Sequence, residues 1–269
     1  MFWEEQNVNS FVESIEKTKG VCVFPIGCIE KHGNHLPFGT DIYTAREIAA
    51  RAAKLEEVMI FPSWPLGMVS EVRHKAGTIA IPGQLQIQVM QEIFSEISRS
   101  GYHKIVLCSG HGGNDDFLRF LTQTCLEKKL DYVLYYPQCL RLKPEQHAAL
   151  ENKYGTIPPG GHADYNETSS IMAIRPDLVH MEQMNPEESM GTGKVNWYFD
   201  HGVNTSINWY ATHPWHFAGD PTGASAEYGE ALLDMQAQNL AEIIRYIKND
   251  DLIPALFREF YALSENPQI

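Results

Sequence analysis

Short, almost unbroken apolar runs alternate along this chain with stretches of helical periodicity. The apolar runs cover residues 21–27, 58–64, 104–110 and 132–136, and the helical stretches between them cover 42–55, 84–100 and 115–130. A strand that is apolar on both faces is typical of a parallel sheet covered by helices on both sides. The strand–helix order therefore predicts an α/β fold, a three-layer α/β/α sandwich with a mainly parallel central sheet.

The second half of the chain predicts further helices and one long irregular segment. The helices are expected at about 169–174, 225–248 and 252–263, and the segment 182–222 is rich in Gly, Asn, Pro and Trp. Irregular segments of this length in compact domains tend to be functional or interfacial. Because no low-complexity linker divides the chain, we expect residues 1–269 to form a single domain.

A dense group of potential metal ligands follows the first predicted strand. Glu30 and His32 are two positions apart, and side chains at that spacing share one face of an extended chain. Asp41 follows Pro37 and Gly39, which can fold the chain back, and it opens the next helix. Asp41 taken alone could be only a helix cap, but the density of Glu, His and Asp between positions 30 and 41 favours a binding site.

A second cluster, Gly110-His-Gly-Gly-Asn114, follows the third predicted strand and opens a helix. Its glycines permit tight turns and a close approach of the backbone to a ligand. A glycine-rich loop before a helix can bind phosphate, but this one lacks the ending of a P-loop and the spacing of a dinucleotide fingerprint. We therefore interpret His111 as a metal ligand.

The third cluster, in residues 160–169, again places a His and a Glu after glycines, at His162 and Glu167. The alternative is that Thr168 or Ser169 only caps the next helix, with Glu167 near its start. In parallel sheets, ligands bind outside the carboxyl ends of the strands, where the three clusters can meet. They offer imidazole and carboxylate donors, which favour Zn²⁺, Mn²⁺ or Fe²⁺, and a shared carboxylate would bring two ions to within roughly 3.5–4 Å.

Charge and composition exclude several classes of function. The net charge of −13 argues against a nucleic-acid partner, which needs clustered Lys and Arg.

The chain has no apolar stretch of membrane-spanning length, and its first residues lack the apolar core of a signal peptide. An odd number of cysteines without a C-x-x-C pair argues against disulfides and thiolate zinc sites. We expect a cytoplasmic protein with a small-molecule substrate. Cys28 is interpreted as a buried core residue, and the alternative is that its thiol is catalytic.

In these clusters the chain resembles the creatininase (creatinine amidohydrolase) family. Family members look like P-x-G-x-x-E-x-H-G-x-H-L-P-x-G-T-D, then G-H-G-G-N, then H-x-x-x-x-E-T-S. This chain has the three motifs in the same order, at residues 25–41, 110–114 and 162–169. Residues 74–79 and 219–229 are similar to two later family segments, so the resemblance spans about residues 20–245.

The resemblance implies a role for each site residue. Glu30 and His111 would bind one divalent metal, His32 and Glu167 would bind the other, and Asp41 would bridge the two. His162 would protonate the leaving nitrogen or act as general acid and base, with Glu167 as the other catalytic residue. The implied reaction is attack of a metal-bound hydroxide on a small, cyclic amide, with Zn²⁺ or Mn²⁺ as the metals and Fe²⁺ as a further option. Family members commonly form homohexamers, so we expect a homo-oligomer.

Two departures from the family pattern bear on the substrate. Enzymes that act on creatinine tend to have Glu where this chain has Gly113, and a Trp shortly before the third-motif His, where this chain has residues 158–161. The alternatives are a metal-dependent deformylase or peptidase with the same centre and, from another class, a non-catalytic metabolite-binding protein using residues 110–113. The aromatic residues of 197–216 predict either a lid or a subunit interface.

Overall fold

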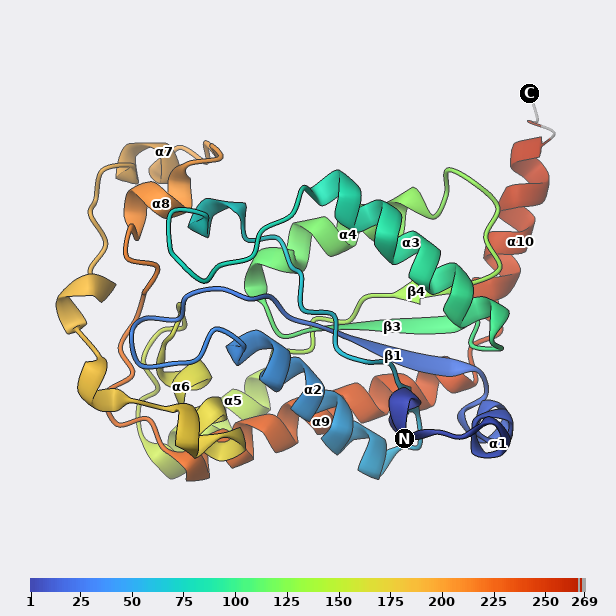
Figure 1. The fold of residues 1–269 in the computed structure, drawn as a ribbon, viewed down its shortest axis with the longest axis horizontal. Helices are drawn as coiled ribbons and strands as arrows, with labels where there is room; N and C mark the ends of the chain where they lie inside the picture. Colours follow the sequence, from blue (N-terminus) through green and yellow to red (C-terminus); the bar gives the residue numbers. More distant parts are fainter. Residues whose placement is uncertain (266, 268–269) are drawn as a thin grey trace.

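A four-stranded parallel sheet forms the centre of the computed structural model, which describes residues 1–265 and 267 (Figure 1). The strands are β1 (Val21–Ile26), β2 (Met59–Ile60), β3 (Lys104–Ser109) and β4 (Val133–Tyr135), in the spatial order β2-β1-β3-β4. Each lies within one of the four predicted apolar runs, and all three pairings are parallel. The predicted α/β fold with a parallel sheet between helices is therefore confirmed.

Helices cover both faces of this sheet. They are α1 (Val8–Thr18), α2 (Thr40–Leu55), α3 (Gly83–Arg99), α4 (Asp115–Thr124), α5 (Pro144–Tyr154), α6 (Tyr165–Ile174), α7 (Asn196–Asp200), α8 (Asn208–Thr212), α9 (Ala226–Lys248) and α10 (Leu252–Glu265). Short 3-10 turns lie at Trp3–Glu5, Ser70–Val72, Gly112–Asn114, Pro176–Leu178, Met181–Gln183 and Pro186–Ser189. Within residues 1–265 and 267, none of the helices is both long and apolar enough to cross a bilayer.

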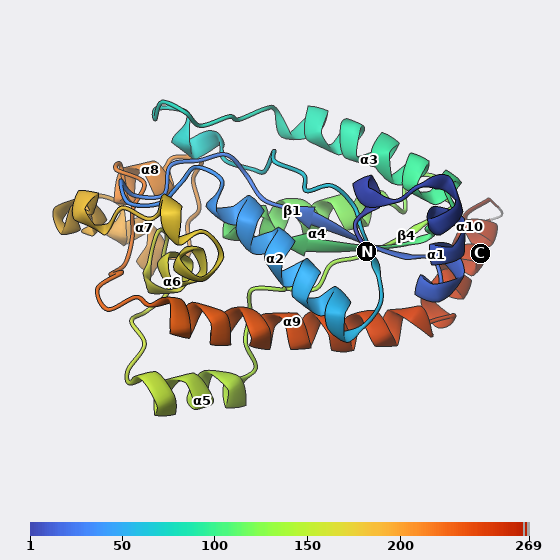
Figure 2. The same ribbon diagram turned by 60° about the horizontal axis from the view of Figure 1, so that its bottom comes forward.

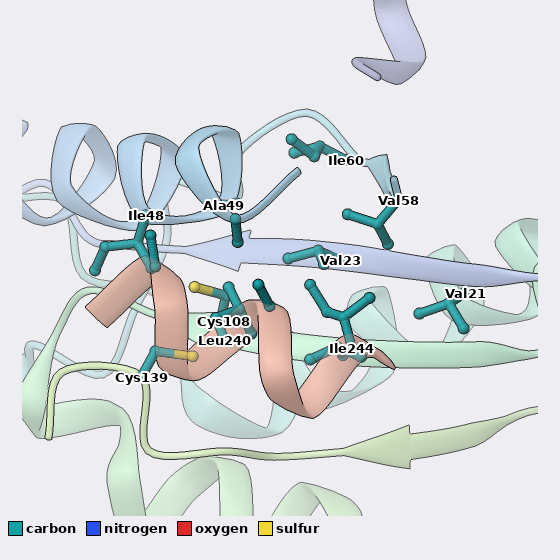
Figure 3. Packing of buried hydrophobic residues seen from close by; sticks show 14 of the residues in the cluster. Val21, Val23, Ile48, Ala49, Val58, Ile60, Cys108, Cys139, Leu240 and Ile244 are labelled. Carbon is teal, nitrogen blue, oxygen red and sulfur yellow. The ribbon is translucent and has the colours of Figure 1, made fainter. Parts of the chain in front are cut away.

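The two faces of the sheet pack against different helices, as Figures 1 and 2 show. Val21 and Val23 of β1 face α2 and α9, in the cluster drawn in Figure 3. Cys22 and Phe24 of the same strand face the opposite way, toward α3 and α4. Alternate residues of one strand thus enter two separate cores, which explains why its sequence is apolar throughout instead of alternating.

The order of the strands creates an opening at one end of the sheet. From β1 the chain passes through α2 to β2 on one side, and it then crosses through α3 to β3 on the other side of β1. Because α2 and α3 lie on opposite faces, the loops that leave β1 and β3 diverge at their carboxyl ends. Such a switch point is where parallel α/β sheets bind ligands.

Local details differ from the sequence prediction around α4. This helix ends at Thr124 and does not continue to residue 130. Asn114, which the sequence suggests as its cap, accepts a hydrogen bond from the Met68 N–H over 2.9 Å and donates one to Ser109 Oγ over 3.3 Å. The Asn114 side chain therefore ties the loop after β2 to the end of β3, a contact between segments distant in sequence.

Candidate metal centre

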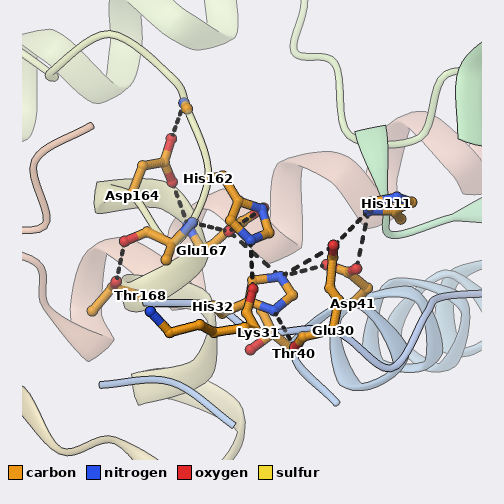
Figure 4. A network of polar contacts seen from close by, with 12 residues as sticks. Glu30, Lys31, His32, Thr40, Asp41, His111, His162, Asp164, Glu167 and Thr168 are labelled. Atoms are coloured by element: carbon orange, nitrogen blue, oxygen red, sulfur yellow. Dashed lines mark hydrogen bonds and ion pairs between the residues drawn. The ribbon is translucent and has the colours of Figure 1, made fainter. Parts of the chain in front are cut away.

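Five predicted ligands from separate segments meet at the switch point (Figure 4). Glu30 and His32 lie in the extended segment after β1, Asp41 in the first turn of α2, His111 directly after β3, and Glu167 in the first turn of α6. Four of them are buried, and the side chain of Glu167 is 26% exposed. The convergence predicted from the three clusters is therefore present in the fold.

The first group of donors lies between the ends of β1 and β3. His111 Nδ1 is 2.9 Å from Glu30 Oε1 and 3.2 Å from Asp41 Oδ2. His111 Nε2 is 3.0 Å from the carbonyl oxygen of Met68, to which it donates its hydrogen. In neutral His111 the lone pair of Nδ1 therefore faces two carboxylate oxygens, an arrangement that is repulsive unless a proton or a cation lies between them.

The second group is arranged in the same way around His32. Its Nδ1 lies 3.2 Å from the backbone oxygen of Glu30, while its Nε2 lies 3.1 Å from Asp41 Oδ1 and 3.7 Å from Glu167 Oε2. The two oxygens of Asp41 thus face different imidazoles, Oδ1 toward His32 and Oδ2 toward His111. A carboxylate that bridges two cations needs this geometry.

The donor set fits two divalent cations. Glu30, Asp41 and His111, and likewise His32, Asp41 and Glu167, each offer atoms within 4.8 Å of one another. When His111 is neutral with its hydrogen on Nε2, the buried Glu30 Oε1 receives no hydrogen bond from the described residues. A buried carboxylate oxygen without a donor is costly, and a metal ion would compensate for it. Imidazole mixed with carboxylate suits Zn²⁺, Mn²⁺ or Fe²⁺ better than Mg²⁺ or Ca²⁺.

Burial and neighbouring charges shift the pKa of two of these donors. Burial alone would lower the pKa of His32, but the carboxylates of Asp41, Glu167 and Glu30 outweigh it and raise this pKa to about 10. Burial raises the pKa of Glu167 to about 8; His32 opposes this rise, and Asp164 and Asp41 add to it. Cations entering such a site displace these protons, so metal binding would release protons to solvent.

The start of α6 places Glu167. Asp164 caps this helix, since its carboxylate accepts the N–H of Glu167 over 2.9 Å. The helix therefore begins four residues before the predicted position 169, and the hypothesis that Thr168 or Ser169 caps it is wrong. The Glu167 carboxylate in turn accepts the N–H of Ala163, which fixes it beside His32.

His162 lies against the second group of donors. Its Nε2 donates to the backbone oxygen of Lys31 over 2.8 Å, its Nδ1 is 3.9 Å from Glu167 Oε2, and its ring centroid is 4.2 Å from that of His32. Burial and then the charge of His32 lower the pKa of His162 to about 3. At neutral pH His162 is therefore uncharged, and the lone pair of its Nδ1 lies on the side of Glu167.

The site contains one residue that sequence reasoning missed. His216 is 2% exposed, and its Nε2 lies 2.6 Å from Glu30 Oε2 although 186 positions separate the two residues. Its ring centroid is 4.0 Å from that of His162. The only sequence signal is a histidine three positions before the Gly219-Asp-Pro segment, inside a stretch interpreted as irregular.

Cys28 also borders the centre. Its Sγ lies 2.9 Å from Asp41 Oδ2, as expected for a side chain two positions before Glu30 in extended chain. Burial, and then the charge of Asp41, raise the pKa of this thiol well above its usual value. A protonated thiol that donates to a carboxylate is not an activated nucleophile, so the geometry favours a supporting role for Cys28 over covalent catalysis.

We therefore expect a Cys28→Ser variant to retain activity within about tenfold, because a hydroxyl donates the same hydrogen bond and the exchange costs under about 1.4 kcal/mol. Cys28→Val, which has no donor, is expected to lose more. Steady-state kinetics of both variants with measured metal content checks this expectation. A Cys28→Ser protein that holds its metals but has no turnover would contradict it and favour a catalytic thiol.

The glycines around His111 serve close packing. A Cβ at Gly110 would lie 2.3 Å from the backbone oxygen of Asp41, and one at Gly27 would lie 2.4 Å from the backbone nitrogen of Ile42. A Cβ at Gly113 would meet His111 Nε2 at 2.4 Å. These positions let the ends of β1 and β3 touch the start of α2, where Asp41 sits, which favours a metal-ligand role for the loop over metabolite binding.

Together the fold and the site define a class: a parallel α/β protein with paired imidazole–carboxylate clusters at the switch point of its sheet. The family model Creatininase, described as creatinine amidohydrolase, matches residues 4–244. The chain therefore belongs to the creatininase family, which confirms the resemblance noted in the sequence, and it is a hydrolase of that family.

Curated relatives within the family differ in substrate. The chain is similar to a creatinine amidohydrolase of Pseudomonas putida, with 25% identity, 84% of this chain and 88% of the relative covered. It is 30% identical to a mycofactocin precursor peptide peptidase of Mycobacterium tuberculosis, with 81% and 82% covered. A 3-dehydro-scyllo-inosose hydrolase of Thermotoga maritima is 23% identical, with 91% and 86% covered.

Solved structures support the fold. A creatinine amidohydrolase (creatininase) crystal structure superimposes with a TM-score of 0.76 at 21% identity, covering 93% of this chain and 98% of that one. Two further creatininase structures are similar at 21% identity. The Zn-Zn type has a TM-score of 0.76, and the match covers 93% of this chain and 98% of that one. The Mn form has a TM-score of 0.75, and the match covers 93% of this chain and 99% of that one. The paired clusters of this chain resemble such a binuclear site.

Proposed function

We propose that this protein is a metal-dependent amidohydrolase that cleaves a C–N bond of a small, cyclic amide. Its metals would be held in two groups that share Asp41: Glu30 and His111 in one, His32 and Glu167 in the other. The arrangement of Asp41 gives the main support, because its two oxygens face two imidazoles whose outer nitrogens are already engaged by backbone carbonyls. Imidazoles oriented by such acceptors are typical of metal ligands.

When bound, the two cations would acidify a water and polarise the substrate carbonyl. His162 then moves the proton: its Nε2–H stays anchored on the Lys31 oxygen, and its Nδ1 accepts a proton and passes it to the leaving nitrogen. Glu167, raised in pKa and beside both His32 and His162, is the second group placed to exchange a proton. Zn²⁺ and Mn²⁺ are the proposed metals, and the donor set also suits Fe²⁺.

A deformylase or peptidase with the same centre is the second candidate. It is favoured by the 30% identity to a mycofactocin precursor peptide peptidase and by Gly113 at the position where creatinine-cleaving enzymes tend to have Glu. The two candidates separate in a turnover screen of metal-loaded protein against cyclic ureas, lactams, formamides and short peptides. Hydrolysis of peptides alone would replace the cyclic-amide proposal.

The metal requirement has a direct test in thermal stability. We expect metal-stripped protein to gain roughly 8–16 °C in Tm on addition of Zn²⁺ or Mn²⁺ at 1,000 times Kd. The reason is that such binding contributes about 4 kcal/mol, and each kcal/mol moves Tm by about 2–4 °C in chains of this size. Differential scanning calorimetry with elemental analysis measures both shift and stoichiometry.

Mg²⁺ is the control for that experiment, because a site with imidazole donors favours the softer ions and should respond weakly to it. Two transition-metal ions per chain would support the amidohydrolase. A protein that takes up no metal from metal-replete medium would contradict it and favour the metabolite-binding alternative.

Assembly and location complete the proposal. Trp197, Tyr198 and Phe199 of α7 are exposed together, as expected of a surface that packs against a second copy. We propose a homo-oligomer, with six copies as in the family, and a cytoplasmic location. Light scattering on the purified protein measures the number of copies in the assembly. A monomer at micromolar concentration would contradict the proposed homo-oligomer.

A further inference from the structure

The irregular segment 182–222 sends one hydrogen-bonded pair into the metal centre. Most of its aromatic side chains are exposed, such as Trp197, which is 62% exposed. Trp209 on α8 and His216 turn inward instead: Trp209 Nε1 lies 2.6 Å from His216 Nδ1, and His216 Nε2 lies 2.6 Å from Glu30 Oε2. The three side chains form a continuous chain of hydrogen bonds from the segment to the proposed ligand Glu30.

The chemistry of the indole fixes where the protons of this chain lie. An indole N–H can only donate, so His216 Nδ1 must accept. His216 is therefore neutral and carries its proton on Nε2, from which it donates to Glu30 Oε2. Trp209 thus selects the one neutral tautomer of His216 that can hold the carboxylate.

Holding one oxygen of Glu30 orients the other. With Oε2 engaged by His216, the carboxylate presents Oε1 toward His111 Nδ1, 2.9 Å away, in the first donor group. Because Glu30 is fully buried, solvent does not compete for Oε2 while His216 occupies this position. The orientation of the Glu30 carboxylate, and with it the geometry that it offers to a cation, therefore depends on the His216 imidazole.

The same pair borders His162. The His162 ring centroid lies 4.0 Å from that of His216, and 6.0 Å from that of Trp209 in an edge-on arrangement. The segment is itself anchored nearby, because the backbone oxygen of Pro214 is 2.8 Å from His74 Nε2 and that of Trp215 is 2.8 Å from Lys31 Nζ. The two residues directly before His216 are therefore held in place.

We propose that Trp209 and His216 are positioning residues that set the orientation of Glu30 and thereby the metal affinity of the centre. The proposal rests on the amidohydrolase function proposed above, since it assumes that Glu30 binds a cation. It gives segment 182–222 a role in the metal centre, beyond those of a lid or a subunit interface. Outer partners of this kind change metal affinity or activity by about 10- to 100-fold when they are removed.

The test compares two identical changes in one segment. Trp209→Phe removes the donor to His216 and keeps an aromatic ring, whereas Trp197→Phe makes the same change at an exposed position. Zn²⁺ affinity, measured by competition with a chromophoric chelator, needs no substrate. We expect Trp209→Phe to weaken Zn²⁺ binding by about 10- to 100-fold. Trp197→Phe should stay within about twofold of wild type, because Trp197 packs on Tyr198 and His201 at the α7 surface and Phe keeps an aromatic ring there for a contact with a second copy.

Two variants of His216 separate positioning from bulk packing. His216→Gln can still donate to Glu30 and accept from Trp209, so it should recover most of the Zn²⁺ affinity that His216→Ala loses. Circular dichroism identifies any variant that does not fold, and His216→Gln still tests the proposal if Trp209→Phe proves unfolded. Where turnover is measurable, the loss should appear in metal affinity and kcat with KM less affected.

The outcomes are distinct. Folded Trp209→Phe and His216→Ala proteins with wild-type Zn²⁺ affinity would overturn the positioning role and leave the amidohydrolase proposal intact. A wild-type protein that binds no Zn²⁺ or Mn²⁺ would overturn the proposed function itself. Weakened affinity in Trp209→Phe, normal affinity in Trp197→Phe and recovery in His216→Gln would support the inference.

Discussion

An Asp41→Asn variant is expected to fold normally and to lose both metal affinity and turnover. Asp41 offers Oδ1 to the His32 side of the centre and Oδ2 to the His111 side, so both proposed cations depend on it. An amide has the same shape but replaces one donor oxygen by an NH₂ group that cannot bind a cation. The loss should exceed the roughly 10- to 100-fold effect of an outer partner, because a shared ligand itself is removed.

Normal folding of Asp41→Asn is expected because the amide keeps the size and shape of the carboxylate. Its costs are the interaction with the helix dipole at the start of α2, about 0.3–1 kcal/mol, and weaker contacts with the Cys28 thiol and the His32 and His111 imidazoles. Asp116→Asn, the same change at the exposed start of α4, is the matched control. Metal content, thermal stability and turnover are measured for both variants by elemental analysis, calorimetry and kinetics. An Asp41→Asn protein with two bound metals and full turnover would remove the basis of the proposed mechanism.

His162→Gln is expected to lower kcat by roughly 10²- to 10⁴-fold, the contribution typical of a positioned proton-transfer group. Gln can keep the hydrogen bond to the Lys31 oxygen, but it cannot accept and return a proton where Nδ1 stands. If His162 acts in proton transfer, the variant should still bind two metals. Single-turnover kinetics with metal analysis therefore distinguishes a proton carrier from a metal ligand at this position.

The distinction matters because His162 also lies within 4.8 Å of donor atoms of Glu30 and His32. Loss of one metal ion in His162→Gln would make His162 a ligand and contradict its assignment as the proton carrier. His147→Gln, at an exposed position on α5, serves as the control for the substitution itself. Full activity in His162→Gln would exclude both roles.

Much of the fold follows from local pattern, and the misses are instructive. The strands were predictable because residues such as Cys22 and Val23 must both be apolar when two cores enclose β1. Helix α1 was not predicted although the sequence contained its signals: Asn7 caps it, and Phe11 and Ile15 recur at helical spacing and pack on the core. The exposed Val8 and Val12 on the same helix make that pattern harder to recognise.

The residues of the candidate site likewise divide into those that the local sequence reveals and one that it does not. Glu30, His32 and Asp41 could be found because they cluster within one loop, and His111 and Glu167 because glycines and family motifs surround them. Nothing in the local sequence connects His216 to Glu30, since its neighbours belong to a segment without periodicity. Its contact exists only because α8 and the segment that follows fold back over the end of β1.

Local sequence was enough to predict the layered parallel architecture and the set of potential ligands, because burial pattern and ligand chemistry are properties of neighbouring residues. The three-dimensional packing sets which oxygen of Asp41 faces which imidazole and which nitrogen of His32 and His111 is engaged by a backbone carbonyl. It also brings Trp209 and His216 to Glu30. Those features depend on distances of a few ångströms between distant parts of the chain, and only the packing of the whole fold sets such distances.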